Sequence, residues 1–366
     1  MKSRSPEFAK EKSRRRPAAN DVAALAGVSP ATVDRVLNRR PNVRSATAQR
    51  VIEAAMELRY LPAHDLYTAL RPKPMQLTFI LPSGNNRYLR MLGAYIASDT
   101  GQHRTFNVDC RCVFVESFNA AALSAAIALH GRRSDGIAFM ALDDDQVRAA
   151  ASKVVGAGKP VLTLISDLPR SGRLAYVGLD NNAVGRTAAR VIGQLTGSSH
   201  GQIGLIAGSL VYQAHREREA GFRALIAERF PQLKVVKVHE GHDDATENYQ
   251  AARNLLTRQP KLSAIYNIGG ASTGVARALR EFSLRRICFV GHGLSPDTRR
   301  MLVDGVMDFA MTQSHENTVL NAVRIFTNFR DGRRPLDGVE PLSINLVTGE
   351  NLPEATSKLG YHDVPR

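Results

Sequence analysis

The stretch DVAALAGVSPATVDRVLN, residues 21 to 38, constrains the fold of this chain more than any other. It predicts two short helices joined by a tight turn. The first helix has an apolar face made of Val22, Ala23, Leu25 and Ala26. Gly27 follows at the point where a helix end favours a residue in the left-handed conformation. The first helix is therefore expected to end there.

The second helix has a clear beginning. Ser29 is expected at its N-cap, where the side-chain oxygen accepts a free backbone N–H, and Pro30 at its first position, where a missing donor costs nothing. The spacing of Val33, Val36 and Leu37 predicts that these three residues face inward. The outward face then consists of Ala31, Thr32, Asp34, Arg35 and Asn38. A face of this kind is suited to the major groove of DNA.

A third helix is indicated by apolar or small residues at helical spacing, Val43, Thr47, Val51, Ala54, Ala55 and Leu58, and Tyr60-Leu61-Pro62 ends it. The whole stretch fits AxLAGVSxxTVxRVLN followed by VxxxTxxxVxxAxxxLxYxP. From residue 21 to residue 62 the chain thus resembles the DNA-binding headpiece of the lactose-repressor (LacI) family. The resemblance implies that residues 18–62 form an all-α helix-turn-helix domain whose partner is double-stranded DNA with a palindromic operator.

The resemblance places DNA contacts of the headpiece at Ser29, Pro30, Ala31, Thr32, Arg35 and Asn38. Arg35 is able to pair bidentately with guanine, whereas Pro30 and Ala31 offer apolar contacts, for example to a thymine methyl. Relatives commonly have Ser at the position of Asp34, where it holds a phosphate. Asp34 either repels phosphate or binds Arg35, and the sequence leaves both possibilities open.

Positive charge is concentrated near the N-terminus. The chain of 366 residues has a formal net charge of +15, and residues 1–74 hold 15 Lys or Arg against seven Asp or Glu, a difference of +8. Such clustering beside a helix-turn-helix favours contact with the phosphate backbone. Residues 1–17 are expected to be a flexible basic arm, which either binds an anionic partner or has no function.

Residues 63–75 correspond to the family's hinge, which folds into a helix on DNA and inserts an apolar wedge into the minor groove. This chain departs from the family here. The usual wedge leucine falls on Ala69, while Leu66 lies one turn earlier and Leu70 one residue later. Either leucine is a candidate wedge.

From residue 76 onward, apolar runs of five to seven residues alternate with helical stretches. The runs lie at 76–82, 110–116, 136–142, 160–166, 202–208, 233–239, 263–269, 286–291 and 307–313. Repeated βα units predict parallel sheets covered on both faces, and nearly 290 residues exceed one such sheet. The resemblance implies that residues 76–366 form a two-lobed, doubly wound α/β domain like periplasmic sugar-binding proteins, with three crossings between the lobes, which also forms a homodimer.

Ligands of such folds lie at the carboxyl ends of strands. Candidate ligand-binding residues are therefore those that follow strands and match family positions: Asn86, Arg87, Asp180, Arg218, Asn267 and Gln313. Arg218 matches the family's R-x-x-G-F arginine, and Asn86 and Arg87 match by position only, together with Asn85 and Tyr88. Asp180 suits ligand binding and helix capping equally well. The alternative for Asn267 is a turn residue before Gly269 and Gly270.

Two departures concern the ligand. Gly293 stands where relatives have a sugar-binding Asp after V-G-x, and Ile268 replaces the Asp that often follows the asparagine. The ligand is therefore expected to differ from a simple hexose. The loop at 239–244, HEGHDD, is a further candidate for the cleft, but its spacing fits no metal site.

Three cysteines without ligand-like spacing are expected to be reduced and structural, and we expect neither a metal nor another cofactor. No segment approaches the ~20 apolar residues of a membrane span, and the N-terminus lacks an apolar signal core, which predicts a cytoplasmic protein without a membrane partner. The sequence predicts a transcription regulator, a repressor, controlled by a small polar effector such as a sugar or polyol. The alternatives are a regulator with a decayed ligand site, or an α/β enzyme of sugar or nucleotide metabolism, against which the missing G-x-G-x-x-G, P-loop and nucleophile elbow argue.

Overall fold

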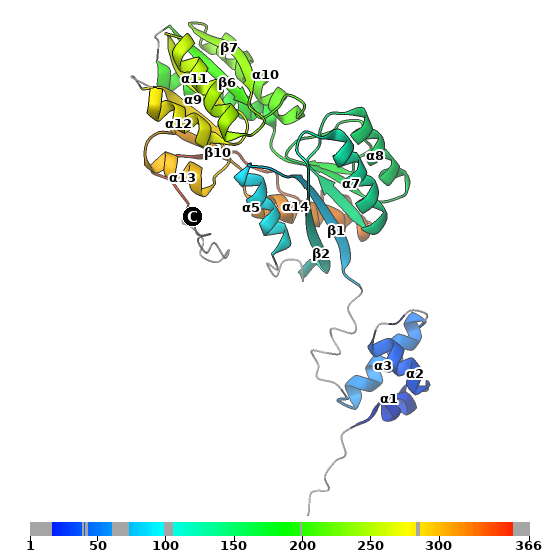
Figure 1. Ribbon diagram of the computed structural model, residues 1–366. Helices are drawn as coiled ribbons and strands as arrows, with labels where there is room; N and C mark the ends of the chain where they lie inside the picture. The colour runs from blue at the N-terminus through cyan, green and yellow to red at the C-terminus, as the bar shows by residue number, and fades with distance from the viewer. Residues whose placement is uncertain are drawn as a thin grey trace, which may run out of the picture. The chain divides into compact units, whose positions relative to one another are not determined.

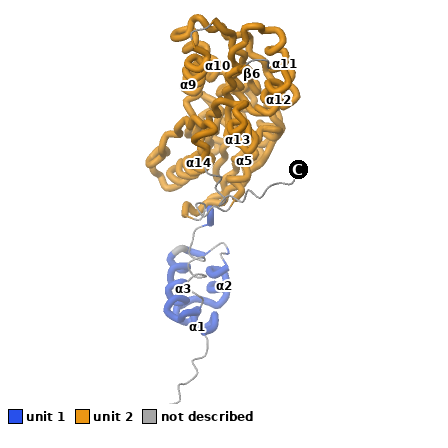
Figure 2. Tube along the Cα trace, turned by 90° about the vertical axis from the view of Figure 1, so that its left-hand side faces the viewer, with its two compact units in different colours: residues 1–74 blue, residues 75–366 orange. Residues whose placement is uncertain are grey.

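The computed structural model describes residues 17–38, 40, 43–60, 73–98, 105–197, 200–282 and 286–353. Internal contacts divide the chain into residues 1–74 and residues 75–366 (Figure 2). The basic arm up to residue 16 and the hinge segment 63–72, with Leu66, Ala69 and Leu70, lie outside the described residues.

The first unit is a bundle of three helices, α1 (Ala19–Ala26), α2 (Pro30–Leu37) and α3 (Ser45–Glu57) (Figure 1). Its core consists of Val22, Ala23, Ala26, Val33, Val36, Val51, Ile52, Ala54 and Ala55. Gly27 has the expected left-handed conformation, with φ of 63°. The prediction for Leu25 was wrong: this residue is 47% exposed, and the buried face of α1 consists of Val22, Ala23 and Ala26.

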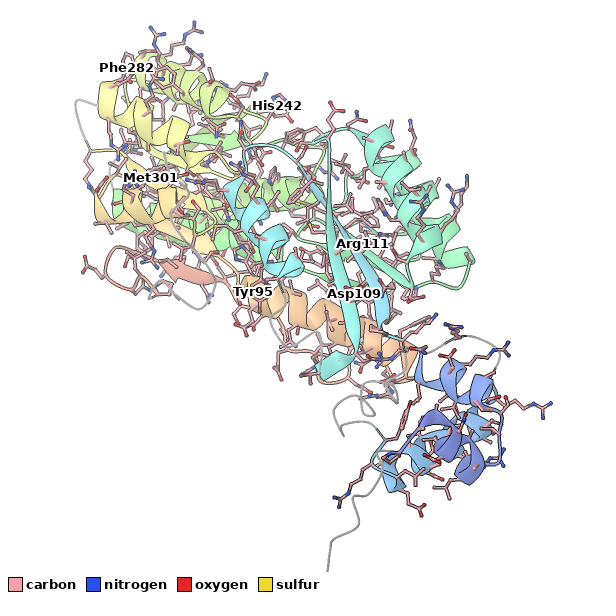
Figure 3. All side chains as sticks on the ribbon, turned by 60° about the horizontal axis from the view of Figure 1, so that its bottom comes forward. Tyr95, Asp109, Arg111, His242, Phe282 and Met301 are labelled. Atoms are coloured by element: carbon pink, nitrogen blue, oxygen red, sulfur yellow. The ribbon has the colours of Figure 1, made fainter. Side chains whose placement is uncertain are left out.

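The first lobe of the second unit is built on a parallel five-stranded sheet of order β2-β1-β3-β4-β5. Its strands are β1 (Met75–Pro82), β2 (Val108–Val115), β3 (Gly136–Phe139), β4 (Val161–Leu164) and β5 (Ala175–Val177). Four helices pack on it: α5 (Arg87–Ala97), α7 (Ala120–Arg133), α8 (Asp145–Gly156) and α14 (His315–Arg330). Arg111 lies on the edge strand β2 (Figure 3). Its Nε donates to Oγ1 of Thr78 over 2.7 Å.

The second lobe contains a six-stranded sheet of order β11-β10-β9-β8-β6-β7, in which only β11 is antiparallel. Its strands are β6 (Gly201–Ala207), β7 (Leu233–Glu240), β8 (Leu262–Asn267), β9 (Cys288–His292), β10 (Phe309–Thr312) and β11 (Asn345–Val347). Helices α9 (Asn181–Thr196) and α10 (Gln213–Arg229) contribute to one core cluster, and α11 (Ala245–Arg258), α12 (Ser272–Phe282) and α13 (Pro296–Val303) to another. Both faces of the sheet are therefore covered.

The chain passes between the lobes three times, before α9, before α14 and before β11, as expected. Each of the nine apolar runs contains a strand. Strand β11 was not predicted, because three residues give no readable apolar pattern. Strand β5 is not among the nine runs, although the choice of Asp180 as a residue that follows a strand assumed it. Within the described part of the chain, no helix has the length and apolar character that a bilayer crossing requires.

Candidate functional sites

Helix α2 of the first unit begins as its sequence predicts. The Ser29 hydroxyl accepts a hydrogen bond from the backbone N–H of Thr32 over 3.2 Å, and Pro30 occupies the first turn. Val33 and Val36 are buried between the helices, whereas Ala31, Asp34, Arg35 and Asn38 are exposed and Thr32 is half-buried. The exposed side of α2 therefore carries the polar groups that the sequence assigned to DNA contact.

The carboxylate of Asp34 is bound by residues at the end of α2. Its Oδ1 accepts a hydrogen bond from Nδ2 of Asn38 over 2.7 Å, and its Oδ2 lies 3.3 Å from Nη1 of Arg40. Neither bond involves Arg35, and no partner for the Arg35 guanidinium is found in the described part of the chain. Asp34 thus leaves Arg35 available to another molecule.

In the second unit, a cavity of about 60 Å³ lies where the two lobes meet. Its lining comes from the carboxyl ends of strands in both sheets: Asn86, Tyr88, Leu89, Met140, Ile165, Leu179, His215, Arg218, Asp243, Gly269, Gly270, His292, Gly293, Met311, Thr312 and Gln313. This is the place where doubly wound folds bind ligands. The volume is well below the roughly 300 Å³ at which ligand pockets begin. In this structure the cavity is therefore smaller than a typical ligand pocket.

The lobes touch directly at the edge of this cavity. Asn86, which caps α5, donates from Nδ2 to Oδ2 of Asp243 over 2.9 Å. Arg87 forms an ion pair with Asp297 at 2.8 Å, and the Tyr88 hydroxyl donates to the Gln313 carbonyl at 3.4 Å. These contacts hold the first lobe, through the start of α5, against two loops and the first turn of α13 in the second lobe.

Arg218 is the cation of the cavity. Its side chain is almost buried, with 8% of the residue exposed. Nε donates to Oδ1 of Asn181 over 2.8 Å, and Nη1 donates to the carbonyl oxygen of Ile268 over 3.0 Å. Both partners are neutral oxygens. A buried guanidinium in such surroundings is costly unless an anion joins it.

Close packing of α9 on α10 places Arg218. A Cβ on Gly221 would lie 2.2 Å from the carbonyl oxygen of Asn182, and one on Gly185 would lie 2.0 Å from that of Arg218. Only glycine permits these approaches. Phe222, the next residue of the motif, is fully buried and stacks on Tyr266 at 5.0 Å between ring centroids. The R-x-x-G-F pattern therefore describes a helix contact as well as a ligand-facing arginine.

Two histidines of the cavity are held in the neutral form. Burial lowers the pKa of His215 to about 4; the negative charge of nearby Asp243 opposes this effect, and the positive charge of Arg218 adds to it. Burial likewise lowers the pKa of His292 well below its usual value, and the positive charge of Arg218 lowers it further. The ring of His292 is hydrogen-bonded to the Tyr266 hydroxyl at 2.9 Å. Both rings offer hydrogen bonds but no charge at neutral pH.

Three residues that the sequence proposed as ligand contacts, Asn86, Arg218 and Gln313, line the cavity together. Arg87 lines an adjoining depression instead, where it meets Asp297. The other two, Asp180 and Asn267, do not line the cavity, and each has the local contacts that the sequence offered as its alternative. Asp180 is exposed and caps α9 by accepting the Ala183 N–H over 2.9 Å, and Asn267 is fully buried behind the cavity wall, donating to Gly270 and Ser272 at 2.8 and 3.0 Å. Asp180 therefore bonds the backbone of its own helix, and Asn267 bonds the loop before α12 and the first residue of that helix.

Sequence reasoning missed several lining residues. Met140, Ile165 and Leu179 follow strands, but apolar residues there cannot be distinguished from strand ends. His215 lies in α10, three residues before Arg218, which places the two on one helix face. Of the 239–244 loop, Asp243 does reach the cavity, with Oδ1 accepting the Gly270 N–H over 2.6 Å. The described residues contain no cluster of three or more His, Cys, Asp or Glu fit to hold a metal ion.

Comparisons with known proteins agree with both parts of this architecture. The family profile described as periplasmic binding protein domain matches residues 113–333, and that of bacterial regulatory proteins of the lacI family matches residues 19–63. The HTH-type transcriptional regulator CelR of Thermobifida fusca is 27% identical over 69% of this chain and 74% of its own length. The lactose operon repressor of Escherichia coli is 26% identical over 72% of this chain and 71% of its own.

Among solved structures, the glucose-galactose binding protein GanP of Geobacillus stearothermophilus has a TM-score of 0.68 at 21% identity, covering 77% of this chain and all of its own. A solute binding protein of Burkholderia graminis in complex with D-arabinose has a TM-score of 0.69 at 24% identity, covering 78% of this chain and 99% of its own. Both likenesses concern the two-lobed fold. A helix-turn-helix unit joined to such a domain defines a DNA-binding transcription regulator. The chain belongs to the lacI family of bacterial regulatory proteins.

Proposed function

We propose that this regulator is a homodimeric repressor that binds a palindromic operator and is controlled by a sugar, a polyol or a related metabolite in the interlobe cavity. The observation that carries the proposal is the shared position of Asn86, Arg218, Asp243 and Gln313, which come from both lobes and converge on one cavity. Amides and a carboxylate that converge in this way suit a ligand with several hydroxyl groups.

The first unit supports readout of a specific sequence. Arg35 is exposed on α2 without a partner in the described part of the chain, as a guanine-reading side chain must be before it binds. Symmetric half-sites follow from a twofold dimer. The proposed contacts of Ser29, Pro30, Ala31, Thr32 and Asn38 surround this arginine on the same helix.

Control by ligand follows from the contacts between the lobes. A ligand that separates Asn86 from Asp243 changes the angle between the lobes, and DNA binding is coupled to that angle. The coupling is reciprocal, so the ligand changes operator affinity by the same factor as the operator changes ligand affinity. Induction and corepression differ only in the sign of this coupling.

The decisive experiment is a selection of bound random duplexes with the purified chain, repeated in the presence of sugars and polyols. A palindrome whose recovery changes with one compound is the expected result. Calorimetric titration of that compound must then give different affinities with and without operator, and equal affinities refute the coupling. If the recovery of the palindrome changes with no compound, and no compound protects the protein against heat, the result favours a regulator with a decayed ligand site. The small volume of the cavity is consistent with that alternative.

A further inference from the structure

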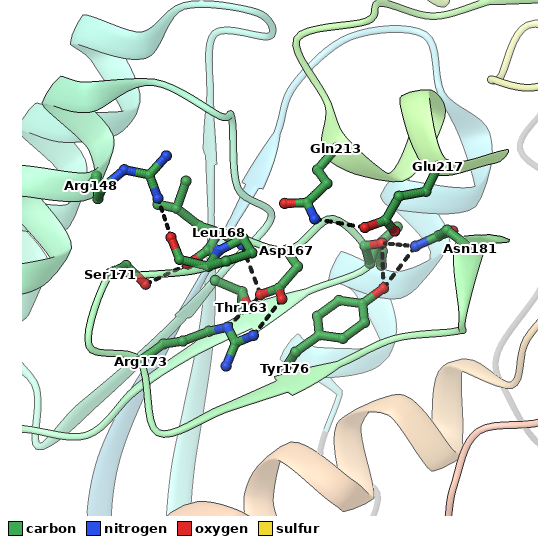
Figure 4. A network of polar contacts seen from close by, with 12 residues as sticks. Arg148, Thr163, Asp167, Leu168, Ser171, Arg173, Tyr176, Asn181, Gln213 and Glu217 are labelled. Carbon is green, nitrogen blue, oxygen red and sulfur yellow. Dashed lines mark hydrogen bonds and ion pairs between the residues drawn. The ribbon is translucent and has the colours of Figure 1, made fainter. Parts of the chain in front are cut away.

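The charges around the interlobe cavity do not balance at Arg218. Its two bonded oxygens, from Asn181 and Ile268, are neutral. Asn181 in turn donates to the Tyr176 hydroxyl over 3.0 Å (Figure 4). The single proton of that hydroxyl is shared between the carbonyl oxygens of Ile165 and Leu179, at 2.8 and 3.1 Å. The hydrogen-bond network behind Arg218 thus contains no anion.

The phenols near Arg218 do not supply the missing charge. Burial raises the pKa of Tyr176, of Tyr88 and of Tyr266, and the positive charge of Arg218 offsets only part of that effect. All three therefore stay protonated at neutral pH. Their hydroxyls act as hydrogen-bond partners and not as counter-ions.

The neighbouring carboxylates already have partners. Asp167 forms an ion pair with Arg173, and Glu217 accepts a hydrogen bond from Gln213 over 2.6 Å (Figure 4). Asp243, which lines the same cavity, likewise has only neutral hydrogen-bond partners, the Gly270 N–H and the Asn86 amide, and is not bonded to the Arg218 guanidinium in the described part of the chain. Among the described residues, no carboxylate forms an ion pair with Arg218. A nearly buried, unpaired cation that lines a cavity calls for an anionic ligand.

We propose that the effector of this cavity is a sugar acid, whose carboxylate pairs with Arg218 while its hydroxyls meet Asp243, His292 and Gln313. The inference rests on the proposed function, in which the cavity binds a hydroxylated ligand. A carboxylate matches the planar fork of a guanidinium and carries the single charge that one arginine balances. A sugar phosphate, in contrast, carries about two negative charges at neutral pH. Because both nearby histidines are neutral, the guanidinium of Arg218 balances only one of these two phosphate charges.

The test uses the full chain and matched pairs of compounds: galacturonate with galactose, glucuronate with glucose, xylonate with xylose, and glucose 6-phosphate as the doubly charged arm. Thermal unfolding and calorimetry measure binding, and operator affinity is measured in parallel. We expect at least one acid to raise the unfolding temperature and to alter operator affinity, while its neutral parent and the phosphate do neither.

Variants of α10 connect the effect to the arginine. Arg218→Gln is expected to weaken acid binding about 30-fold or more, because it removes one partner of a buried charged pair. Arg223→Gln removes the same charge from the same helix, where Arg223 pairs with Glu219 outside the cavity, and is expected to keep acid binding. The comparison of acid with neutral parent on the unmodified chain needs no variant and stands even if Arg218→Gln fails to fold.

Binding of neutral sugars or of the sugar phosphate in preference to acids would overturn the sugar-acid effector and leave a ligand-controlled regulator intact. Equal acid binding by Arg218→Gln and the unmodified chain would also overturn it. Operator binding that no compound of either charge alters would overturn the proposed control by ligand as well.

Discussion

Asn38 donates a hydrogen bond from Nδ2 to Oδ1 of Asp34 over 2.7 Å, one turn apart on the exposed side of α2. The N–H of Arg40 donates to the Arg35 carbonyl over 2.8 Å, a bond typical of helix C-termini that holds the chain beside the helix and brings the Arg40 guanidinium back to Asp34. An acidic side chain is thereby neutralised on a surface proposed to face phosphate.

This arrangement predicts that Asp34→Ser strengthens operator binding, because it removes a negative charge and releases Arg40 for a phosphate. The plot of log K against log salt is expected to steepen by about one per half-site. Fluorescence anisotropy at several salt concentrations measures both quantities. Glu57→Ser removes a carboxylate from the end of α3 and serves as the control, with a smaller expected effect. Weaker binding by Asp34→Ser would mean that Asp34 itself reads DNA.

Arg35→Ala is expected to reduce discrimination by about 1 to 3 kcal/mol at one base pair in each half-site, because it removes the one side chain of α2 suited to bidentate pairing with guanine. Competition with operators that carry single substitutions measures the effect. The control is Arg50→Ala on α3, which removes an exposed charge and is expected to change affinity equally for all sequences. An unchanged base preference in Arg35→Ala would contradict the assignment.

The sequence predicts the strands well, because a strand buried on both faces of a parallel sheet is a continuous apolar run. It predicts the site less well. The carboxylate of Asp180 and the amide of Asn267 have the right chemistry, but capping α9 and fixing the turn before α12 need the same chemistry. Whether a side chain that follows a strand faces the cleft or its own backbone depends on how the lobes pack, which no local pattern contains.

Asn86→Ala is expected to loosen the cleft, since it removes the hydrogen bond to Asp243 between the lobes. It also removes the cap of α5, at a cost of about 1 kcal/mol. Asn119→Ala is the matched control, because Asn119 caps α7 in the same way, through the Ala122 N–H, without lining the cavity. Hydrogen exchange at the Gly270 amide is expected to accelerate in Asn86→Ala only. Equal exchange in both variants would show that this hydrogen bond does not hold the lobes together.

Acid is expected to destabilise the two-lobed unit through its buried histidines. Burial lowers the pKa of His315 to about 4, and its Nε2 has no hydrogen-bond partner among the described residues. The unfolded chain takes up this proton near pH 6.5, so stability is full above that pH and falls as pH drops towards 4. The loss from one such group approaches about 3 kcal/mol.

His315→Phe keeps the ring that packs on Tyr88 at 4.2 Å between centroids and removes the titrating nitrogen. Urea unfolding at pH 7 and pH 5 is expected to show a smaller loss of stability in this variant than in the unmodified chain. An identical loss would assign the acid sensitivity to other groups, with His215 the next to test because burial lowers its pKa to about 4 as well.

Gly221→Ala tests how Arg218 is placed. The added Cβ would lie 2.2 Å from the Asn182 carbonyl oxygen, so α10 must move away from α9, at a cost of about 1 to 3 kcal/mol of unfolding free energy. The same shift displaces the guanidinium from Asn181 and is expected to abolish the response to ligand while leaving operator binding in place. Gly156→Ala, at the end of α8 with no atom near its added Cβ, is the control and is expected to stabilise the chain by up to about 1 kcal/mol. If Gly221→Ala responds to ligand like the unmodified chain, the contact between the two helices does not position Arg218, and the two bonds of its guanidinium suffice.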